Sequence, residues 1–174
     1  MNKNDFITIT IKGRIAFATC CFENALKHYN YTTSDWRSVL TQLWRYTNIE
    51  FLDDWHYETA EFLPESILEF NTYKEENFEY INEEQFNILH KVYNDSNDIV
   101  KNIIKMIFEI GISEFYGRLQ NYGQRTLDNL DILINYMMLN SIPLPDINMF
   151  MAMKYEDENG WGNDFDGAKF SSIL

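Results

Sequence analysis

Apolar side chains recur every three or four residues along most of the chain, which is the spacing of one face of an α-helix. The first run predicts a helix over residues 5–29, with its apolar positions at Ile7, Ile11, Ile15, Ala18, Phe22 and Leu26. Residues 6–11 also alternate between apolar and polar positions, so an extended segment is the alternative there. A lone strand without a partner is not stable in water, which favours the helix.

Capping residues mark where the next helices begin. Thr33 or Ser34 is expected to cap a second helix. Its apolar stripe is formed by Trp36, Val39, Leu40, Leu43 and Trp44. Residues 51–63 predict a shorter helix, with Leu52, Trp55 and Phe62 on its apolar side. Pro64 suits the first position of another short helix that ends at residue 70.

The second half of the chain repeats this arrangement of caps and apolar stripes. Residues 71–81 read as a loop, and Asn82 caps a helix over residues 83–93. Residues 98–119 carry the longest periodic pattern. Thr126 is expected to cap a helix that ends at residue 139, and Asp146 to begin a short helix that ends at residue 153.

Within the segment 98–119, the helical period places the apolar and the charged side chains on opposite faces. The inward set is Ile99, Ile103, Ile107, Ile110 and Phe115, and the outward set is Lys101, Lys105, Glu109 and Glu114. Gly111 lies inside this pattern, where glycine costs about 1 kcal/mol relative to alanine. We therefore expect a neighbouring element to approach the helix closely at Gly111.

The tail, residues 154–174, is rich in glycine and aspartate and is expected to be irregular until a helical turn at residues 170–174. Trp161, Phe165 and Phe170 are expected to pack it onto the helices. Residues 155–166 resemble a calcium loop at positions three, five and six, but Tyr155 and Asp166 stand at its first and last ligand positions. A structural role for the tail is favoured. The chain is thus predicted to be one all-α domain, residues 1–174, with about six to eight helices.

Composition supports a well-filled core and a reducing compartment. Hydrophobic residues make up 45% of the chain and aromatic residues 16%. Cys20 and Cys21 lie in an apolar run and are expected to be buried as small hydrophobes, with a vicinal redox pair as the alternative. The sequence shows neither a signal peptide nor a long apolar span, so we expect a cytoplasmic protein.

The negative charge is concentrated in one segment. The formal net charge is −13, and residues 50–84 hold twelve acids against the single base Lys74. Such a segment either keeps the protein in solution or attracts a basic protein partner. Phosphates and anionic membranes would be repelled, so neither nucleic acid nor a membrane is an expected partner. The predicted partner-binding residues are Glu50, Asp53, Asp54, Trp55, Tyr57, Glu58, Glu61, Glu75, Glu76 and Glu79.

Signals for catalysis or metal binding are weak. The three histidines, His28, His56 and His90, form no close ligand pair, and neither a phosphate-binding loop nor a nucleophile elbow occurs. We therefore expect no enzyme activity, no cofactor and no metal. Two alternatives stay open: a helical scaffold or regulatory subunit that forms homodimers, and an enzyme whose acids converge with His56 or His90.

Several short stretches together resemble a known group of proteins. They are Gly-Arg-Ile-Ala-Phe-Ala at 13–18, Cys-Phe-Glu-Asn at 21–24, Leu-Pro-Glu at 63–65, Ile-Pro-Leu-Pro at 142–145, Gly-Trp-Gly-Asn at 160–163 and Phe-Asp at 165–166. This combination resembles small bacterial all-helical immunity proteins of polymorphic toxin systems. The resemblance implies a cytosolic protein, monomer or homodimer, that neutralises a cognate toxin, often a nuclease with a basic cleft.

Overall fold

The computed structural model describes residues 1–31, 33–115 and 119–174, and their α-helices confirm the all-α prediction. The helices are α1 (Ile11–His28), α2 (Arg37–Trp44), α3 (Leu52–Glu61), α4 (Pro64–Leu68), α5 (Glu83–Asp95), α6 (Asp98–Ile112) and α7 (Gln124–Leu139). Short 3-10 turns lie at Lys3–Phe6, Thr33–Trp36, Arg45–Thr47, Tyr73–Glu75, Ile147–Phe150, Asp157–Gly160 and Gly167–Lys169. Within the described ranges, the only β pairing is one isolated bridge between Ile9 and Lys154.

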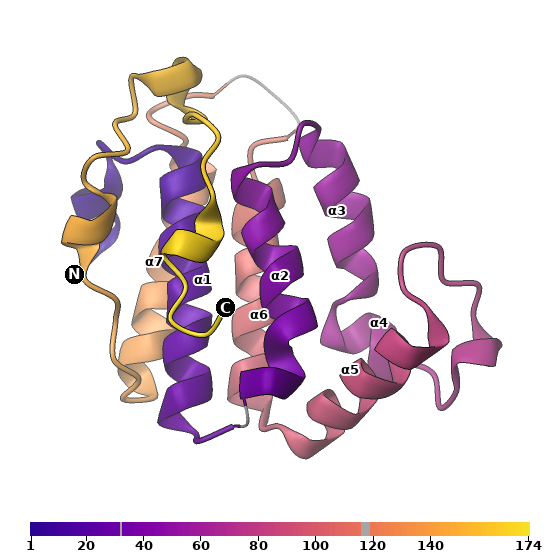
Figure 1. Cartoon of the computed structure of the whole chain (residues 1–174). Helices are drawn as coiled ribbons and strands as arrows, with labels where there is room; N and C mark the ends of the chain where they lie inside the picture. The colour runs from indigo at the N-terminus through magenta and orange to yellow at the C-terminus, as the bar shows by residue number, and fades with distance from the viewer. Residues whose placement is uncertain (32, 116–118) are drawn as a thin grey trace.

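α1 is the central helix of the bundle. It packs against α6 and α7, while α3 and α4 pack on the other side of α6, and α5 lies against α4 (Figure 1). Every residue from 11 to 23 is buried, because α2, the tail and the turn Ile147–Phe150 cover the sides that α6 and α7 leave open. The free thiols of Cys20 and Cys21 are buried in this core, as predicted. Of the helices in the described part of the chain, none combines the length and apolar character needed to cross a bilayer.

The first predicted helix begins later than the periodicity indicated. α1 starts at Ile11, and the hydroxyl of Thr10 caps it by accepting from the Gly13 amide at 3.2 Å. Just before the cap, the chain is extended and pairs with the tail: the Thr10 amide donates to the Met153 carbonyl at 2.9 Å. The helix prediction for residues 7–10 is therefore wrong, because the cap and the tail both compete for this backbone.

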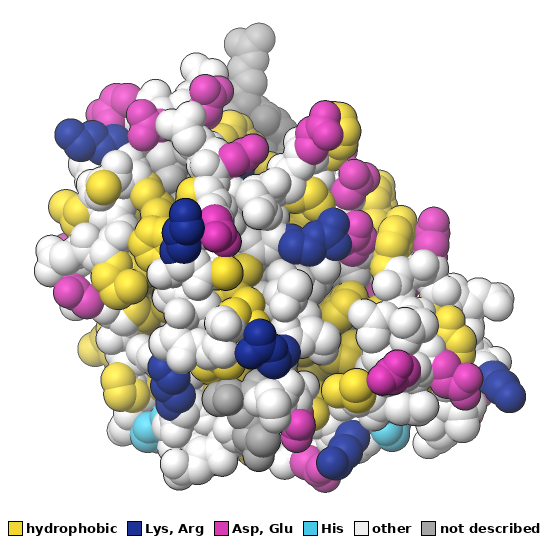
Figure 2. All heavy atoms as spheres, in the orientation of Figure 1, with side chains coloured by type: hydrophobic (Ala, Val, Ile, Leu, Met, Phe, Trp, Pro, Cys, Tyr) yellow, Lys and Arg dark blue, Asp and Glu magenta, His cyan; other side chains and the backbone are white. Residues whose placement is uncertain are grey.

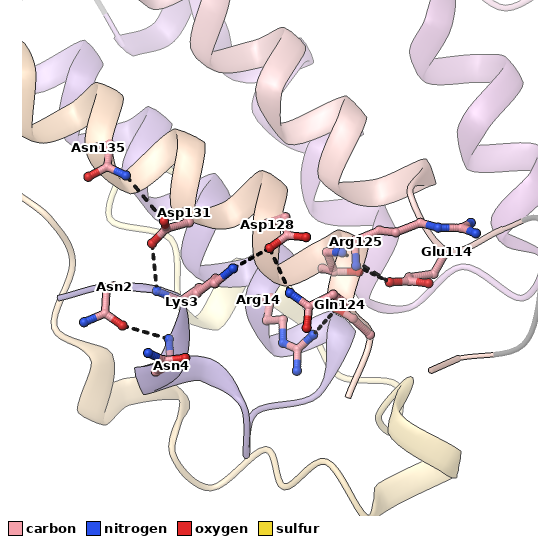
Figure 3. A network of polar contacts seen from close by, with 12 residues as sticks. Asn2, Lys3, Asn4, Arg14, Glu114, Gln124, Arg125, Asp128, Asp131 and Asn135 are labelled. Carbon is pink, nitrogen blue, oxygen red and sulfur yellow. Dashed lines mark hydrogen bonds and ion pairs between the residues drawn. The ribbon is translucent and has the colours of Figure 1, made fainter. Parts of the chain in front are cut away.

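The N-terminal turn is fastened to α7 (Figure 3). The Lys3 ammonium pairs with Asp128 at 2.6 Å, and the Lys3 amide donates to Asp131 at 2.9 Å. Arg14, fully buried on α1, donates to the carbonyls of Phe6, Ile7 and Gly123. Desolvation lowers the pKa of Arg14 to about 10, against the opposing influence of Tyr155 and Glu114.

The junction between α6 and α7 departs from the prediction. α6 ends at Ile112 rather than residue 119, and part of the predicted extension, residues 116–118, lies outside the described residues. Glu114 was expected to face solvent but is only 6% exposed. Its carboxylate accepts from the amides of Arg125 at 2.9 Å and Thr126 at 3.2 Å (Figure 3). Glu114 therefore caps α7, and Thr126 lies inside the helix instead of capping it.

Of four other predicted helix starts, two are confirmed and two are wrong. Asn82 caps α5 through a capping box with Gln85, and Pro64 is the first residue of α4. α2 begins at Arg37, after a 3-10 turn, so neither Thr33 nor Ser34 is its N-cap. Asp146 caps a single 3-10 turn in place of the predicted helix.

The tail is irregular and packed down, as predicted, although its last turn is Gly167–Lys169 rather than residues 170–174. The ring of Phe170 stacks on Phe150 with centroids 5.7 Å apart. Buried Glu23 accepts from the Ser172 amide at 2.7 Å and from the indole of Trp44 at 3.1 Å. A charged side chain on the central helix thus holds the end of the tail between α1 and α2 (Figure 1).

Candidate protein-binding face

Several exposed acids lie along α3 and in the loop that returns to it. Glu50 precedes α3, and Asp53 and Asp54 occupy its first turn, where they also complement the helix dipole. The hydroxyl of Tyr80 has a raised pKa because of partial desolvation and of the carboxylates Glu79, Glu61, Asp54 and Glu58 around it, largest effect first. The returning loop therefore brings its own charges to those of the helix.

Exposed aromatic rings lie among these carboxylates. Phe51 is 60% exposed, Tyr57 56% and Tyr80 41%. Figure 2 shows carboxylates and hydrophobic side chains gathered along the edge of the molecule where α3 lies. We call this surface the acidic face, which comprises Glu50, Phe51, Asp53, Asp54, Tyr57, Glu79 and Tyr80.

Trp55, predicted to be an exposed anchor on this face, is 0% exposed. Its ring packs edge-on against Tyr46, with centroids 4.9 Å apart, and its indole donates to the Gln42 carbonyl at 2.9 Å. A Cβ added at Gly111 would stand 2.7 Å from the Trp55 ring, which confirms the close approach expected at that glycine. Trp55 is therefore a core residue, and its assignment as an anchor is wrong.

Glu58 and Glu61 have structural partners that limit their availability to another protein. Glu58 forms an ion pair with Arg45, and its side chain is 18% exposed. Glu61 accepts from the backbone amides of Glu79 at 2.7 Å, Tyr80 at 2.8 Å and Ile81 at 3.2 Å. Glu61 thus holds the returning loop against α3 and supports the acidic face from beneath.

Glu75 and Glu76, the remaining predicted binding residues, lie apart from α3. They belong to the loop that projects beyond α4 and α5 in Figure 1. The Glu75 carboxylate accepts from the Thr72 hydroxyl at 3.0 Å and the Asn71 amide at 3.2 Å, so it shapes this loop. At the end of the loop, it is Glu79 whose charge raises the pKa of Tyr80, together with the acids of α3.

An open pocket of about 380 Å³ borders the acidic face where α3 begins. Its lining consists of Glu50, Phe51, Leu52, Asp53, Phe115 and Trp161. The rings of Phe115 and Trp161 lie with their centroids 6.4 Å apart. Neither Phe51 as a binding residue nor this pocket was predicted from the sequence. The one sequence feature that indicates an exposed Phe51 is its position, one residue before the apolar stripe of α3 begins at Leu52.

The histidines are packed among aromatic rings rather than among acids. His56 contacts Tyr57 and Phe108 with centroid distances of 5.0 and 5.6 Å, and His90 stacks on Phe86 at 5.6 Å. In the part of the chain that the structure describes, no three His, Cys, Asp or Glu side chains converge as metal ligands. In the calcium-like loop, Tyr155 lies under the guanidinium of Arg14, 5.5 Å from the ring centroid.

Comparisons with protein-family models, with curated proteins and with solved structures gave no match. The chemistry of the acidic face is therefore the basis for a functional proposal.

Proposed function

We propose that this protein is a non-enzymatic binding protein whose acidic face receives a basic protein. The observation that supports this most is the combination of exposed rings with clustered acids: Phe51, Tyr57 and Tyr80 lie among the carboxylates of α3 and its returning loop. Rings with large exposed areas are the side chains that most often anchor protein interfaces. Surfaces that serve solubility alone avoid exposed phenylalanine.

The distribution of charge supports a partner of opposite sign. Between residues 50 and 84 the net charge is −11, from twelve acids and one base. A field of this kind raises association rate constants by roughly 10- to 1,000-fold for a complementary partner, and salt screens it beyond about 8–10 Å. The acidic face would thus speed encounter, while the aromatic rings would slow dissociation.

Within this class of binding proteins, the resemblance to immunity proteins favours a toxin domain as the partner. A nuclease toxin binds phosphates through a basic cleft, and an acidic protein surface competes for the same charges. We therefore propose that the chain neutralises a cognate bacterial toxin in the cytoplasm. The genomic prediction is that the gene immediately upstream encodes a large secreted protein that ends in a toxin domain.

The test measures association of the chain with that C-terminal domain by stopped flow across a range of ionic strength. In the face variant Asp53→Asn, Asp54→Asn, Glu79→Gln, we expect the association rate constant at low salt to fall about tenfold and its salt dependence to flatten. Glu58 and Glu61 are left intact because their loss would disturb the fold.

A matched control removes the same number and kind of charges elsewhere on the surface. The control variant Asp35→Asn, Asp95→Asn, Glu109→Gln changes exposed acids on the turn before α2, the end of α5 and the α7 side of α6. It should keep most of the rate. Equal losses in the two variants would assign the effect to net charge and would contradict the assignment of the acidic face.

One observation favours the second candidate function, a helical subunit that forms homodimers. α7 exposes Ile132, Met138 and Leu139, the last of them 83% exposed. Ile132 also lines a groove of about 270 Å³ between α6 and α7. Light scattering after size exclusion, at two protein concentrations, separates the candidates: a monomer at both favours the inhibitor, and a dimer lost in Ile132→Ser, Leu139→Ser favours the homodimer.

A further inference from the structure

Three segments far apart in the sequence form the pocket beside the acidic face. Glu50, Phe51 and Asp53 come from the start of α3, Phe115 follows the end of α6, and Trp161 belongs to the tail. Their convergence lines the pocket with three aromatic residues, which we call its walls, and two acids, which we call its rim. The binding chemistry of this pocket is therefore a property of the tertiary fold.

The tail residue in this pocket is firmly held. The carbonyl of Trp161 accepts from the Lys12 amide of α1 at 3.0 Å, and the Trp161 amide donates to the Glu158 carbonyl at 3.1 Å. On the next residues, Gly162 packs against Thr10 with a φ of +91°, and Asp164 pairs with the buried Lys12 ammonium. A preorganised ring costs little entropy when a ligand stacks on it.

The walls and rim together suit a planar cation on an apolar stem. Phe51 is exposed, Phe115 and Trp161 are partly exposed, and all three line the pocket. Aromatic faces attract cations, tryptophan most strongly, and a guanidinium can stack on a ring while its N–H groups donate to carboxylates. Among the described residues, Glu50 and Asp53 have no ion pair within 4.0 Å.

The N-terminal end of α3 carries a partial positive charge, which is smaller than the negative charge of the acids beside it. The amides of the first helical turn amount to about +0.5 charge. Glu50, Asp53 and Asp54 bring three full negative charges to the same end of the helix. The local field therefore favours a cation over an anion.

We propose that this pocket binds an arginine side chain of the basic partner. The identity of the partner rests on the proposed function, whereas the affinity of the pocket for a guanidinium group is testable without it. Lysine is the weaker ligand, because its compact ammonium is strongly hydrated and cannot stack as a plane.

The experiment follows the indole N–H resonances of the full chain, labelled with nitrogen-15, during titration with acetyl-Gly-Arg-Gly-amide. The chain has four tryptophans; Trp36, Trp44 and Trp55 are buried, and Trp161 is partly exposed. Trp161→Phe identifies its resonance. We expect that resonance alone to shift, with a dissociation constant in the millimolar range. The same peptide with citrulline, a neutral isostere of arginine, should bind at least tenfold more weakly.

Two double variants test the rim. Glu50→Gln, Asp53→Asn should weaken the arginine peptide about tenfold, whereas the matched pair Glu109→Gln, Asp95→Asn should leave the titration unchanged. An equal response to citrulline, an equal loss in both variants, or an unshifted Trp161 resonance would each overturn the proposal.

These results separate the pocket from the proposed function. The variant Asp54→Asn, Glu79→Gln leaves both rim acids of the pocket in place. If it weakens binding of the toxin domain while the parent chain gives no response to the arginine peptide, the pocket alone is overturned. A peptide response confined to Trp161, with no binding of the toxin domain, would support the pocket and contradict the proposed partner.

Discussion

Replacement of Glu114 by alanine removes the side chain that caps α7 from outside that helix. Glu114 accepts from the amides of Arg125 and Thr126, the second and third residues of α7, at 2.9 and 3.2 Å. The N-cap residue itself is Gly123, which has no side chain to supply this contact. In Glu114→Ala both amides lose their acceptor, and the site is only 6% exposed to replacing water.

The cost follows from these contacts. A hydrogen bond to a charged group contributes about 1.5–3 kcal/mol, and the loss of a helix cap costs about 0.5–2 kcal/mol. These two values count the same contacts and are not added. Removal of the buried carboxylate also recovers part of the free energy that its desolvation costs. We therefore expect Glu114→Ala to lower the free energy of unfolding by about 2–4 kcal/mol. Glu114→Gln keeps one acceptor oxygen and should lose about half as much.

Urea unfolding followed by circular dichroism measures this loss. With a denaturant slope of about 2 kcal/mol per molar, a loss of 2–4 kcal/mol lowers the midpoint by about 1–2 M. Glu109→Ala, an exposed acid on α6, is the matched control and should stay within about 0.5 kcal/mol of the parent. If Glu114→Ala were no more destabilised than Glu109→Ala, the capping role would be refuted.

Three further predictions test the core, the tail and the thiols. Gly111→Ala places a methyl group 2.7 Å from the rigid Trp55 ring, so overpacking of about 1–3 kcal/mol should outweigh the gain in helix propensity of up to about 1 kcal/mol and lower the melting temperature. Glu23 accepts from Ser171 and Ser172, and the Ser171 hydroxyl in turn accepts from the amides of the last two residues. Glu23→Gln weakens this acceptor, so the amides of residues 172–174 should exchange hydrogen faster while those of α1 do not change. Burial raises the pKa of Cys20 to about 12 and that of Cys21 well above its usual value of 9.0, so their protonated forms persist in the folded state. The unfolded thiols lose their protons above pH 9 and the folded ones keep them, so each thiol should lower the free energy of unfolding by about 1.4 kcal/mol per pH unit above pH 9. In alkaline unfolding measurements, a Cys20→Ala, Cys21→Ala variant should lose this part of the decline and keep the part that buried Tyr46 and Tyr93, whose pKa values are also raised, contribute above pH 10.

Local sequence signals predicted the helices that depend on local interactions. The capping box at Asn82 and the proline at the start of α4 act within a few residues, and both appear where the sequence indicated. The start of α1 and the end of α6 were misplaced. Thr10 pairs with the tail at Met153, and Glu114 turns inward to cap α7. Those outcomes depend on contacts that helical periodicity does not encode.

The candidate site also has features that the sequence predicts and features that arise only in the folded chain. The concentration of acids between residues 50 and 84 is visible in the sequence, and α3 carries part of it. Periodicity also placed Trp55 on the apolar stripe with Leu52 and Phe62, so the burial of Trp55 was predictable and its use as an exposed anchor was inconsistent with that stripe. The pocket was not predictable, because Phe115 and Trp161 reach it from distant segments.

Hydrogen exchange of the chain, measured alone and with the proposed toxin partner, tests whether the acidic face receives a basic protein. We expect binding at this face to bring new protection over α3, Leu52–Glu61, and over the returning loop at residues 79–81. Protection confined to α7, Gln124–Leu139, with α3 unchanged, would contradict it.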